Sequence, residues 1–332
     1  MKIDVFSHIM PGSYFRRMVE LDPKGGDINS RIRVAAALHD LDERFRAMDE
    51  FGDYAQILSL VAPPIESYGS RAAEMARLAN DGLAELVRKY PDRFLGFVAS
   101  LPMNEPEGLL AEARRAVEDL GAAGVQVFTN VSGHPLDRPE TLPLFELMAE
   151  LDRPVWMHPT RGADFPDYQR ETRSRYEIWW AFGWPHETSV AMAHLVFSGL
   201  FDRHPDLKII THHMGGTIPY LEGKVGPGFD ALGTRTTTED YGALLRQLKR
   251  RPIDYFRMFY ADTALFGARA ATVCGLDFFG VDHTLFGTDA PFGPEGKWGY
   301  TRWTIEVIDG LELAAADRQA IYEGNARRLL KL

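Results

Sequence analysis

The sequence predicts a (β/α)8 barrel, and three observations carry the prediction. Eight short apolar or β-branched segments alternate with longer amphipathic segments along the 332 residues, which is the element count of a closed barrel. Side chains that can bind a metal follow several of the predicted strands directly. The first strand leads into His8-Ile9-Met10-Pro11 and not into the glycine-rich phosphate loop typical of an open doubly wound sheet.

The strands are justified by their apolar, β-branched composition, and the helices by amphipathic spacing between them. We expect strands at 2–7, 54–60, 94–101, 124–129, 154–158, 207–212, 257–262 and 283–288. We expect helices near 40–51, 70–89, 107–120, 139–151, 186–199, 240–250, 266–275, 299–309 and 314–330. The segments near 10–38 and 159–184 are long for barrel loops, so we expect insertions over the C-terminal face of a single domain spanning 1–332.

The composition and charge of the chain limit the classes of partner that it can bind. Hydrophobic residues make up 45% of the chain and charged residues 25%, an ordinary globular balance. The formal charge of −10 with no basic run argues against nucleic acid or an anionic membrane as a partner. The single cysteine, Cys274, excludes an internal disulfide. Since the N-terminus runs into a strand without an apolar leader, we expect a soluble, cytoplasmic protein.

The C-terminal ends of the strands hold the candidate site, because barrel active sites are built there. His8, His158, His213 and Asp289 each follow a predicted strand. Imidazole and carboxylate ligands suit a divalent ion such as zinc, manganese or iron. Any one of these histidines could instead cap a helix or fill a polar pocket, but four equivalent strand ends favour a shared site.

Longer motifs around these residues resemble a known family. They are Ile3-Asp4-Val5-Phe6-Ser7-His8-Ile9, Val155-Trp156-Met157-His158-Pro159, the run 201–208 followed by His213-Met214-Gly215-Gly216 and Pro219, and Leu285-Phe286-Gly287-Thr288-Asp289-Ala290-Pro291-Phe292. Over nearly the whole chain they resemble the amidohydrolase-related proteins of the aminocarboxymuconate-semialdehyde decarboxylase group, which includes gamma-resorcylate decarboxylase. The resemblance implies a barrel of the metal-dependent hydrolase type, a metal held by His8, His158 and Asp289, a catalytic His213, and a homodimer.

Further matches point to the decarboxylases of this group. The segment 42–49 (DERFRAMD) resembles a helix whose first arginine binds a substrate carboxylate. This resemblance assigns that role to Arg44, whose guanidinium can hold a carboxylate through two parallel hydrogen bonds. Trp180 resembles a wall of the substrate pocket, and Phe292 a residue that flanks the substrate. By themselves these residues could equally be a solvated helix arginine and two core or interface aromatics.

Phe6 departs from the family pattern. The family commonly has a histidine ligand at this position, and phenylalanine cannot coordinate a metal. We expect Phe6 to face the metal pocket, because alternation places it on the same face as His8, and to contact the substrate. Three protein ligands can still hold a catalytic ion. The alternatives are a site that works without metal and a barrel that has lost catalysis.

Three neighbouring residues receive secondary assignments. Because adjacent strand residues face opposite sides and the family register selects His213, we expect His212 to pack between strand and helix. Asp4 is expected to have a structural role or to support a metal ligand without binding the metal itself. Asp262 ends the seventh strand, where contact with the site is possible.

The predicted function is therefore metal-dependent, non-oxidative decarboxylation of an unsaturated or aromatic carboxylic acid, with no organic cofactor. We expect zinc, with manganese or iron as alternatives, and Asp289 or His213 as the group that protonates the carbon losing CO2. One rival is a hydrolase or hydratase on the same barrel. Another, motivated by Phe6, is a non-catalytic ligand-binding barrel.

Overall fold

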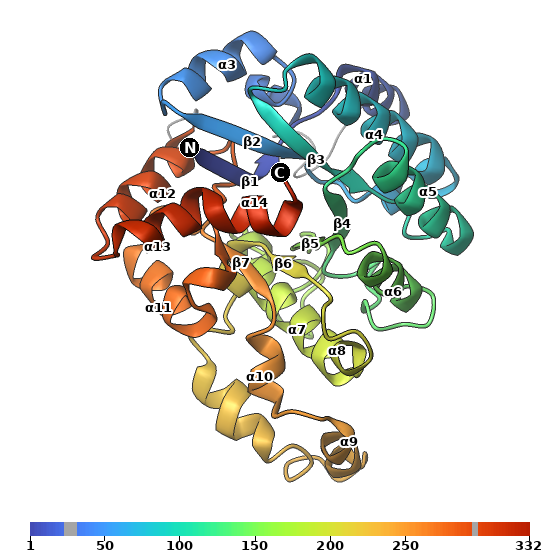
Figure 1. The fold of residues 1–332 in the computed structure, drawn as a ribbon. Helices are drawn as coiled ribbons and strands as arrows, with labels where there is room; N and C mark the ends of the chain where they lie inside the picture. The colour runs from blue at the N-terminus through green and yellow to red at the C-terminus, as the bar shows by residue number, and fades with distance from the viewer. Residues whose placement is uncertain (23–31, 294–297) are drawn as a thin grey trace.

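A computed structural model describes residues 1–22, 32–293 and 298–332. Within these residues eight parallel strands form one sheet in the order β1-β2-β3-β4-β5-β6-β7-β8. Backbone hydrogen bonds from Val5 to Phe286 and from His8 to Ala290 join β1 to the β8 segment and close the barrel. The predicted (β/α)8 barrel is confirmed (Figure 1).

The strands and helices alternate as expected. The strands are β1 (Lys2–His8), β2 (Tyr54–Ser59), β3 (Phe94–Ser100), β4 (Gly124–Phe128), β5 (Val155–His158), β6 (Ile209–Thr211), β7 (Tyr260–Asp262) and β8 (Thr284–Leu285). The α-helices are α1 (Gly12–Leu21), α3 (Leu41–Asp49), α4 (Ala72–Lys89), α5 (Pro106–Glu118), α6 (Leu142–Glu150), α7 (Trp184–Phe197), α8 (Leu200–Arg203), α9 (Tyr241–Gln247), α10 (Pro252–Phe256), α11 (Arg269–Phe279), α12 (Gly299–Asp309), α13 (Ala315–Gln319) and α14 (Asn325–Leu330).

Local sequence signals fix several helix starts. The Asp40 side chain accepts hydrogen bonds from the backbone N–H groups of Asp42 and Glu43, which caps α3, as expected of an aspartate at this position. Pro106 begins α5, where the missing N–H of proline costs nothing. Helices of the outer ring then bury their apolar faces against the sheet, and the largest core cluster lies between the two layers.

The barrel interior is filled by side chains from strands far apart in the sequence. Phe6, Trp156, Ile210 and Leu285 belong to one buried cluster. The indole N–H of Trp156 donates to the carbonyl oxygen of Val5 at 3.0 Å and so links β5 to β1. The residues at the strand ends lie on top of this packed interior.

Both segments predicted as insertions depart from the barrel. After β1 the chain forms α1 and the short helix η1 (Ala36–Leu38), while 23–31 lie outside the described residues. Met10, Tyr14 and Leu38 pack there with Val61 and other apolar residues in a second cluster. After β5 the chain runs to η3 (Trp179–Gly183) before α7 begins. A further excursion between β6 and β7, which carries α9 and α10, extends away from the barrel (Figure 1).

None of the helices in the described part of the chain combines the length and the apolar character needed to cross a membrane.

Candidate active site

Imidazoles and one carboxylate gather where β1, β5, β6 and β8 end. One ligand atom from each of His8, His158 and His212 lies within 4.8 Å of the others, and the same holds for His212, His213 and Asp289. Nε2 of His8 lies 3.1 Å from Oδ1 of Asp289, and Nε2 of His212 lies 3.5 Å from that oxygen. The structure therefore brings together all four predicted strand-end residues and adds His212.

The local backbone explains why both adjacent histidines reach the cluster. Strand β6 ends at Thr211, and His213 and Met214 then adopt positive φ angles of 54° and 53°. The strand alternation on which the expectation for His212 was based therefore stops before His213. Gly216 completes the turn at φ 64°, where a Cβ atom would lie 2.3 Å from the Pro185 carbonyl oxygen; only glycine fits both conditions.

The expectation that His212 packs between strand and helix is wrong. Its ring is fully buried inside the barrel and stacks on Phe6, with ring centroids 3.8 Å apart and 16° between the planes. Two signals in the sequence could have found it. His212 directly follows a strand, as Asp289 follows the β8 segment, and it shares the parity of Ile210, which points into the interior.

Each imidazole has its Nδ1 atom held by the protein. Nδ1 of His158 donates to the Pro159 carbonyl oxygen at 2.6 Å, and Nδ1 of His213 donates to the Ala264 carbonyl oxygen at 2.7 Å. Nδ1 of His212 contacts the Asp262 carboxylate, and Nδ1 of His8 lies 3.1 Å from Ser59 Oγ. A carbonyl oxygen can only accept, so Nε2 is the free ligand atom of His158 and His213.

Asp262 supports the cluster from outside it. Besides its contact with His212, its Oδ1 accepts hydrogen bonds of 3.0 Å from the backbone N–H groups of His213 and Ala264. Asp4 has a similar supporting place under the β8 segment, where it accepts from the Tyr54 hydroxyl at 2.6 Å and from the Thr288 backbone N–H at 3.1 Å. Both carboxylates thus fix the backbone next to the site residues at the strand ends.

The pKa values of the residues in the cluster are shifted in different directions. Burial, reinforced by His212 and His8, lowers the pKa of His158 well below its usual value. Burial and His212 lower the pKa of His213 to about 4. Burial also opposes the charged forms of His212 and Asp289, but opposite charges outweigh it: the pKa of His212 is raised to about 9, chiefly by Asp262, and that of Asp289 lies far below its usual range beside His212 and His8.

These residues fit a divalent metal ion. Nε2 of His8 and Nε2 of His212 are buried and face Oδ1 of Asp289, but neither makes a hydrogen bond to a residue that the structure describes. Leaving such atoms unpaired costs about 1–3 kcal/mol each, which a cation bound between them and Asp289 would recover. Imidazole nitrogens with one carboxylate are a common donor set for zinc and related ions.

A pocket lined by aromatic side chains opens above the cluster. Trp180, Trp184, Phe292 and Tyr300 line it together with His8, His158 and Asp289. The Trp184 ring lies 5.5 Å from the His158 ring, centroid to centroid. The structure thus places Trp180 and Phe292 where a substrate could contact them, while Trp184 and Tyr300 were not identified from the sequence.

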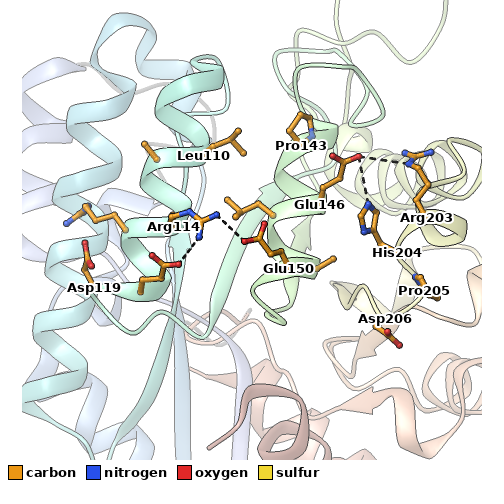
Figure 2. A pocket seen from close by; sticks show the side chains of 15 residues that line it. Leu110, Arg114, Asp119, Pro143, Glu146, Glu150, Arg203, His204, Pro205 and Asp206 are labelled. Atoms are coloured by element: carbon orange, nitrogen blue, oxygen red, sulfur yellow. Dashed lines mark hydrogen bonds and ion pairs between the residues drawn. The ribbon is translucent and has the colours of Figure 1, made fainter.

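A second, larger hollow lies elsewhere, between α5 and α6 (Figure 2). Its facing side chains pair with one another: Arg114 with Glu150 at 3.4 Å, and Glu146 with His204 at 3.9 Å. It is lined by outer helices and by residues that precede β6, so it lies away from the carboxyl ends of the strands. We therefore assign the chemistry to the aromatic pocket.

Phe6 faces the imidazole cluster as expected, but not the substrate pocket. Its side chain is fully buried beneath the stacked ring of His212, with the His8 ring 5.7 Å away. This packing leaves Phe6 no surface for a substrate, so the predicted substrate contact does not fit the structure.

Arg44 also departs from its predicted role. Its side chain is fully buried and donates to Gln56 Oε1 at 2.9 Å and to the carbonyl oxygens of His8 and Ala37 at 2.8 and 3.1 Å. It is not among the residues that line the aromatic pocket. These contacts do not fit the predicted binding of a substrate carboxylate; in this structure Arg44 ties α3 to the end of β1 and so fixes the backbone of His8.

This geometry predicts that Arg44→Met destabilises the fold. The substitution leaves Gln56 and two carbonyl oxygens buried without their donor, which should lower the free energy of unfolding by about 2 kcal/mol or more. Urea unfolding measures the change, with Arg46→Met as the control on the exposed side of the same helix. An unchanged unfolding midpoint with a raised KM would return Arg44 to the substrate-binding role.

The fold and the site together define a barrel of the metal-dependent hydrolase type. A family model described as Amidohydrolase matches residues 3–332, and the chain belongs to this family.

Relatives with named activities agree with this membership. The chain is 38% identical to the gamma-resorcylate decarboxylase of Polaromonas sp. over 302 residues, covering 88% of this chain and 87% of that protein. It is 31% identical to the 2-amino-3-carboxymuconate-6-semialdehyde decarboxylase of Dictyostelium discoideum, covering 100% and 92%. It also superposes with a TM-score of 0.79 and 32% identity on a dihydroxybenzoic acid decarboxylase from Polaromonas sp. with bound manganese and the inhibitor 2-nitroresorcinol, covering 100% and 97%.

Proposed function

We propose that this protein is a metal-dependent decarboxylase that removes CO2 from an aromatic carboxylic acid without oxidation. The observation that carries the proposal is the cluster of buried imidazoles and one carboxylate at the base of an aromatic-lined pocket. The named activities of the relatives supply the substrate class. Hydroxybenzoates such as gamma-resorcylate are the first candidates, because two of these relatives act on such acids.

His8, His158 and Asp289 would hold the metal ion. When bound, a divalent ion supplies positive charge that stabilises the negative charge developing on substrate oxygens. The imidazole-rich donor set supports zinc, whereas the manganese in the related structure makes manganese the first alternative, with iron as the second.

The roles of His213 and Asp289 follow from their protonation. Asp289 stays ionised at neutral pH because its pKa is strongly lowered, which suits a ligand better than an acid. His213 is neutral at that pH, so its free nitrogen can take a proton from solvent or from a substrate hydroxyl and return it to the ring carbon. In this proposal the carbon–carboxylate bond breaks, its electron pair stays on the ring carbon, and the proton from His213 takes the place of CO2.

The aromatic walls would orient the substrate. Trp180 and Phe292, with Trp184 and Tyr300, present ring faces or edges to the pocket, and such surfaces stack well on a planar ring. A flat substrate held in this way would direct its carboxylate toward the cluster at the base. The same arrangement disfavours long flexible acids, which gain less from stacking.

The test is product analysis with the purified protein. With zinc or manganese added, a panel of hydroxybenzoates and carboxymuconate-like acids should yield CO2 and the ring or diene lacking its carboxylate. A product that keeps the carboxylate, ring-opened or hydrated, would replace decarboxylation by the hydrolase or hydratase. Binding without turnover under every metal would indicate a non-catalytic barrel.

A further inference from the structure

We infer that His212 is itself a ligand of the divalent ion, so that this metal centre has exchanged a ligand position on β1 for one at the end of β6. The inference rests on the proposed metal dependence and adds a fourth protein ligand to His8, His158 and Asp289. It also assigns Phe6, which occupies the exchanged position, as the residue that supports the new ligand.

The distances within the cluster suit one ion that binds His8, His212 and Asp289, with His158 beside them. Two ligands of a tetrahedral ion with bonds of about 2.0–2.2 Å lie about 3.3–3.6 Å apart. Nε2 of His212 is 3.5 Å from Oδ1 of Asp289, and Nε2 of His8 is 3.1 Å from the same oxygen. His158 lies next to two of these groups, with one ligand atom within 4.8 Å of those of His8 and His212.

The surroundings of His212 orient it for this role. Its Nδ1 atom contacts the Asp262 carboxylate, the arrangement in which a ligating histidine commonly donates its second N–H to a carboxylate. Its Nε2 atom faces Oδ1 of Asp289 at 3.5 Å, a contact that makes no hydrogen bond within the described ranges. Binding of the ion at Nε2 would displace the proton that the two carboxylates keep on this ring in the metal-free protein. A buried histidine in a merely structural role would be expected to satisfy both nitrogens.

Phe6 and His212 occupy complementary places. Their rings stack at 3.8 Å and 16°, so the side chain that cannot bind metal forms the surface against which the added imidazole rests. A second imidazole at position 6 would serve the ion from β1, and the site would then not need His212. The two positions therefore behave as alternatives for one ligand.

A consequence of the exchange concerns metal preference. Three imidazoles and one carboxylate form a nitrogen-rich set, which favours zinc over manganese, since manganese prefers oxygen ligands. Zinc should therefore displace manganese from the wild-type site when both ions compete at equal concentration.

The experiment is a zinc titration of metal-stripped protein against a chromophoric chelator. His8→Ala and His212→Ala should each weaken zinc binding by more than the factor of about 10–100 typical of residues that only support a ligand. Asp262→Asn should weaken it by about that smaller factor. His204→Ala, at a surface histidine that lies near Glu146, is the matched control and should leave affinity unchanged.

A rescue variant tests the exchange itself. Phe6→His combined with His212→Ala should recover part of the zinc affinity that His212→Ala loses, and the cobalt-substituted double variant should show a visible absorption spectrum close to that of the wild type. Thermal unfolding of each metal-free variant checks that the barrel is intact. If the double variant binds no better than the single one, position 6 and position 212 are not alternatives and the exchange is overturned.

The outcomes separate this inference from the proposed function. If His8→Ala abolishes zinc binding while His212→Ala leaves it within twofold of wild type, His212 is not a ligand although the metal site stands. If neither substitution changes zinc binding, the metal dependence itself fails. Loss of zinc binding in both variants, with rescue by Phe6→His, supports both the metal dependence and the role of His212 as a ligand.

Discussion

Replacing His158 with alanine should empty the metal site and reduce decarboxylation to the background rate, while the barrel stays folded. His158 is buried at the end of β5, and its Nδ1 is committed to the Pro159 carbonyl oxygen, so its Nε2 is the atom available to an ion. Because its pKa is lowered well below the usual value, the ring is neutral at pH 7 and needs no deprotonation to bind. The metal content measured by elemental analysis should fall from about one ion per chain to almost none, because the site loses one of its imidazole ligands.

The control for this experiment is His194→Ala. His194 is partly exposed on α7 and pairs with Asp137 at 3.1 Å, away from the cluster. Circular dichroism of both variants should match the wild type. Equal metal content in wild type and His158→Ala would remove His158 from the ligand set.

Replacing His213 with glutamine should lower kcat by about 100- to 10,000-fold, the range expected when a positioned acid–base group is lost, and should leave the bound metal in place. The amide can occupy the space of the ring and donate to the Ala264 carbonyl oxygen as the imidazole does, but it cannot carry a proton between substrate and solvent. Single-turnover kinetics with elemental analysis of the same sample separates the two effects. The split between retained metal and lost turnover is the signature of a proton carrier.

His283→Gln is the matched substitution outside the site, since its Nδ1 lies 3.0 Å from the Phe259 carbonyl oxygen at the other end of the barrel. It should keep wild-type kcat. A His213→Gln protein with unchanged kcat would assign the proton transfer to another group, whereas loss of metal would make His213 a ligand.

The barrel could be predicted from the sequence because its signals are local. Each strand is a short run of apolar or β-branched residues, and each strand end is marked by the residue that follows it. His8, His158 and Asp289 were found by this rule, and the structure brings them together. Strand order needed no long-range information, because consecutive parallel strands joined by helices pair in sequence order.

The residues that sequence reasoning placed wrongly depend on geometry that no local pattern encodes. His212 was assigned to the outside because the strand was assumed to continue through His213, whereas it ends at Thr211 and the chain turns with positive φ. Arg44 was matched by its position on a helix, but its direction is set by acceptors on β1 and β2. Tyr300 lies on α12, and nothing in its neighbourhood marks it as part of the pocket.

The two buried Nε2 atoms of His8 and His212 also link the amount of folded protein to the supply of metal. A ligand that binds the native state and not the unfolded chain stabilises the native state by mass action, by about 2.7 kcal/mol when its free concentration is 100 times its Kd. Here the ion would bind two buried nitrogen atoms that make no hydrogen bond in the described part of the chain, and so would remove a cost that the metal-free fold carries. In a cell short of the ion, this barrel would therefore lose conformational stability together with activity, and degradation would remove the apoprotein faster than the loaded enzyme.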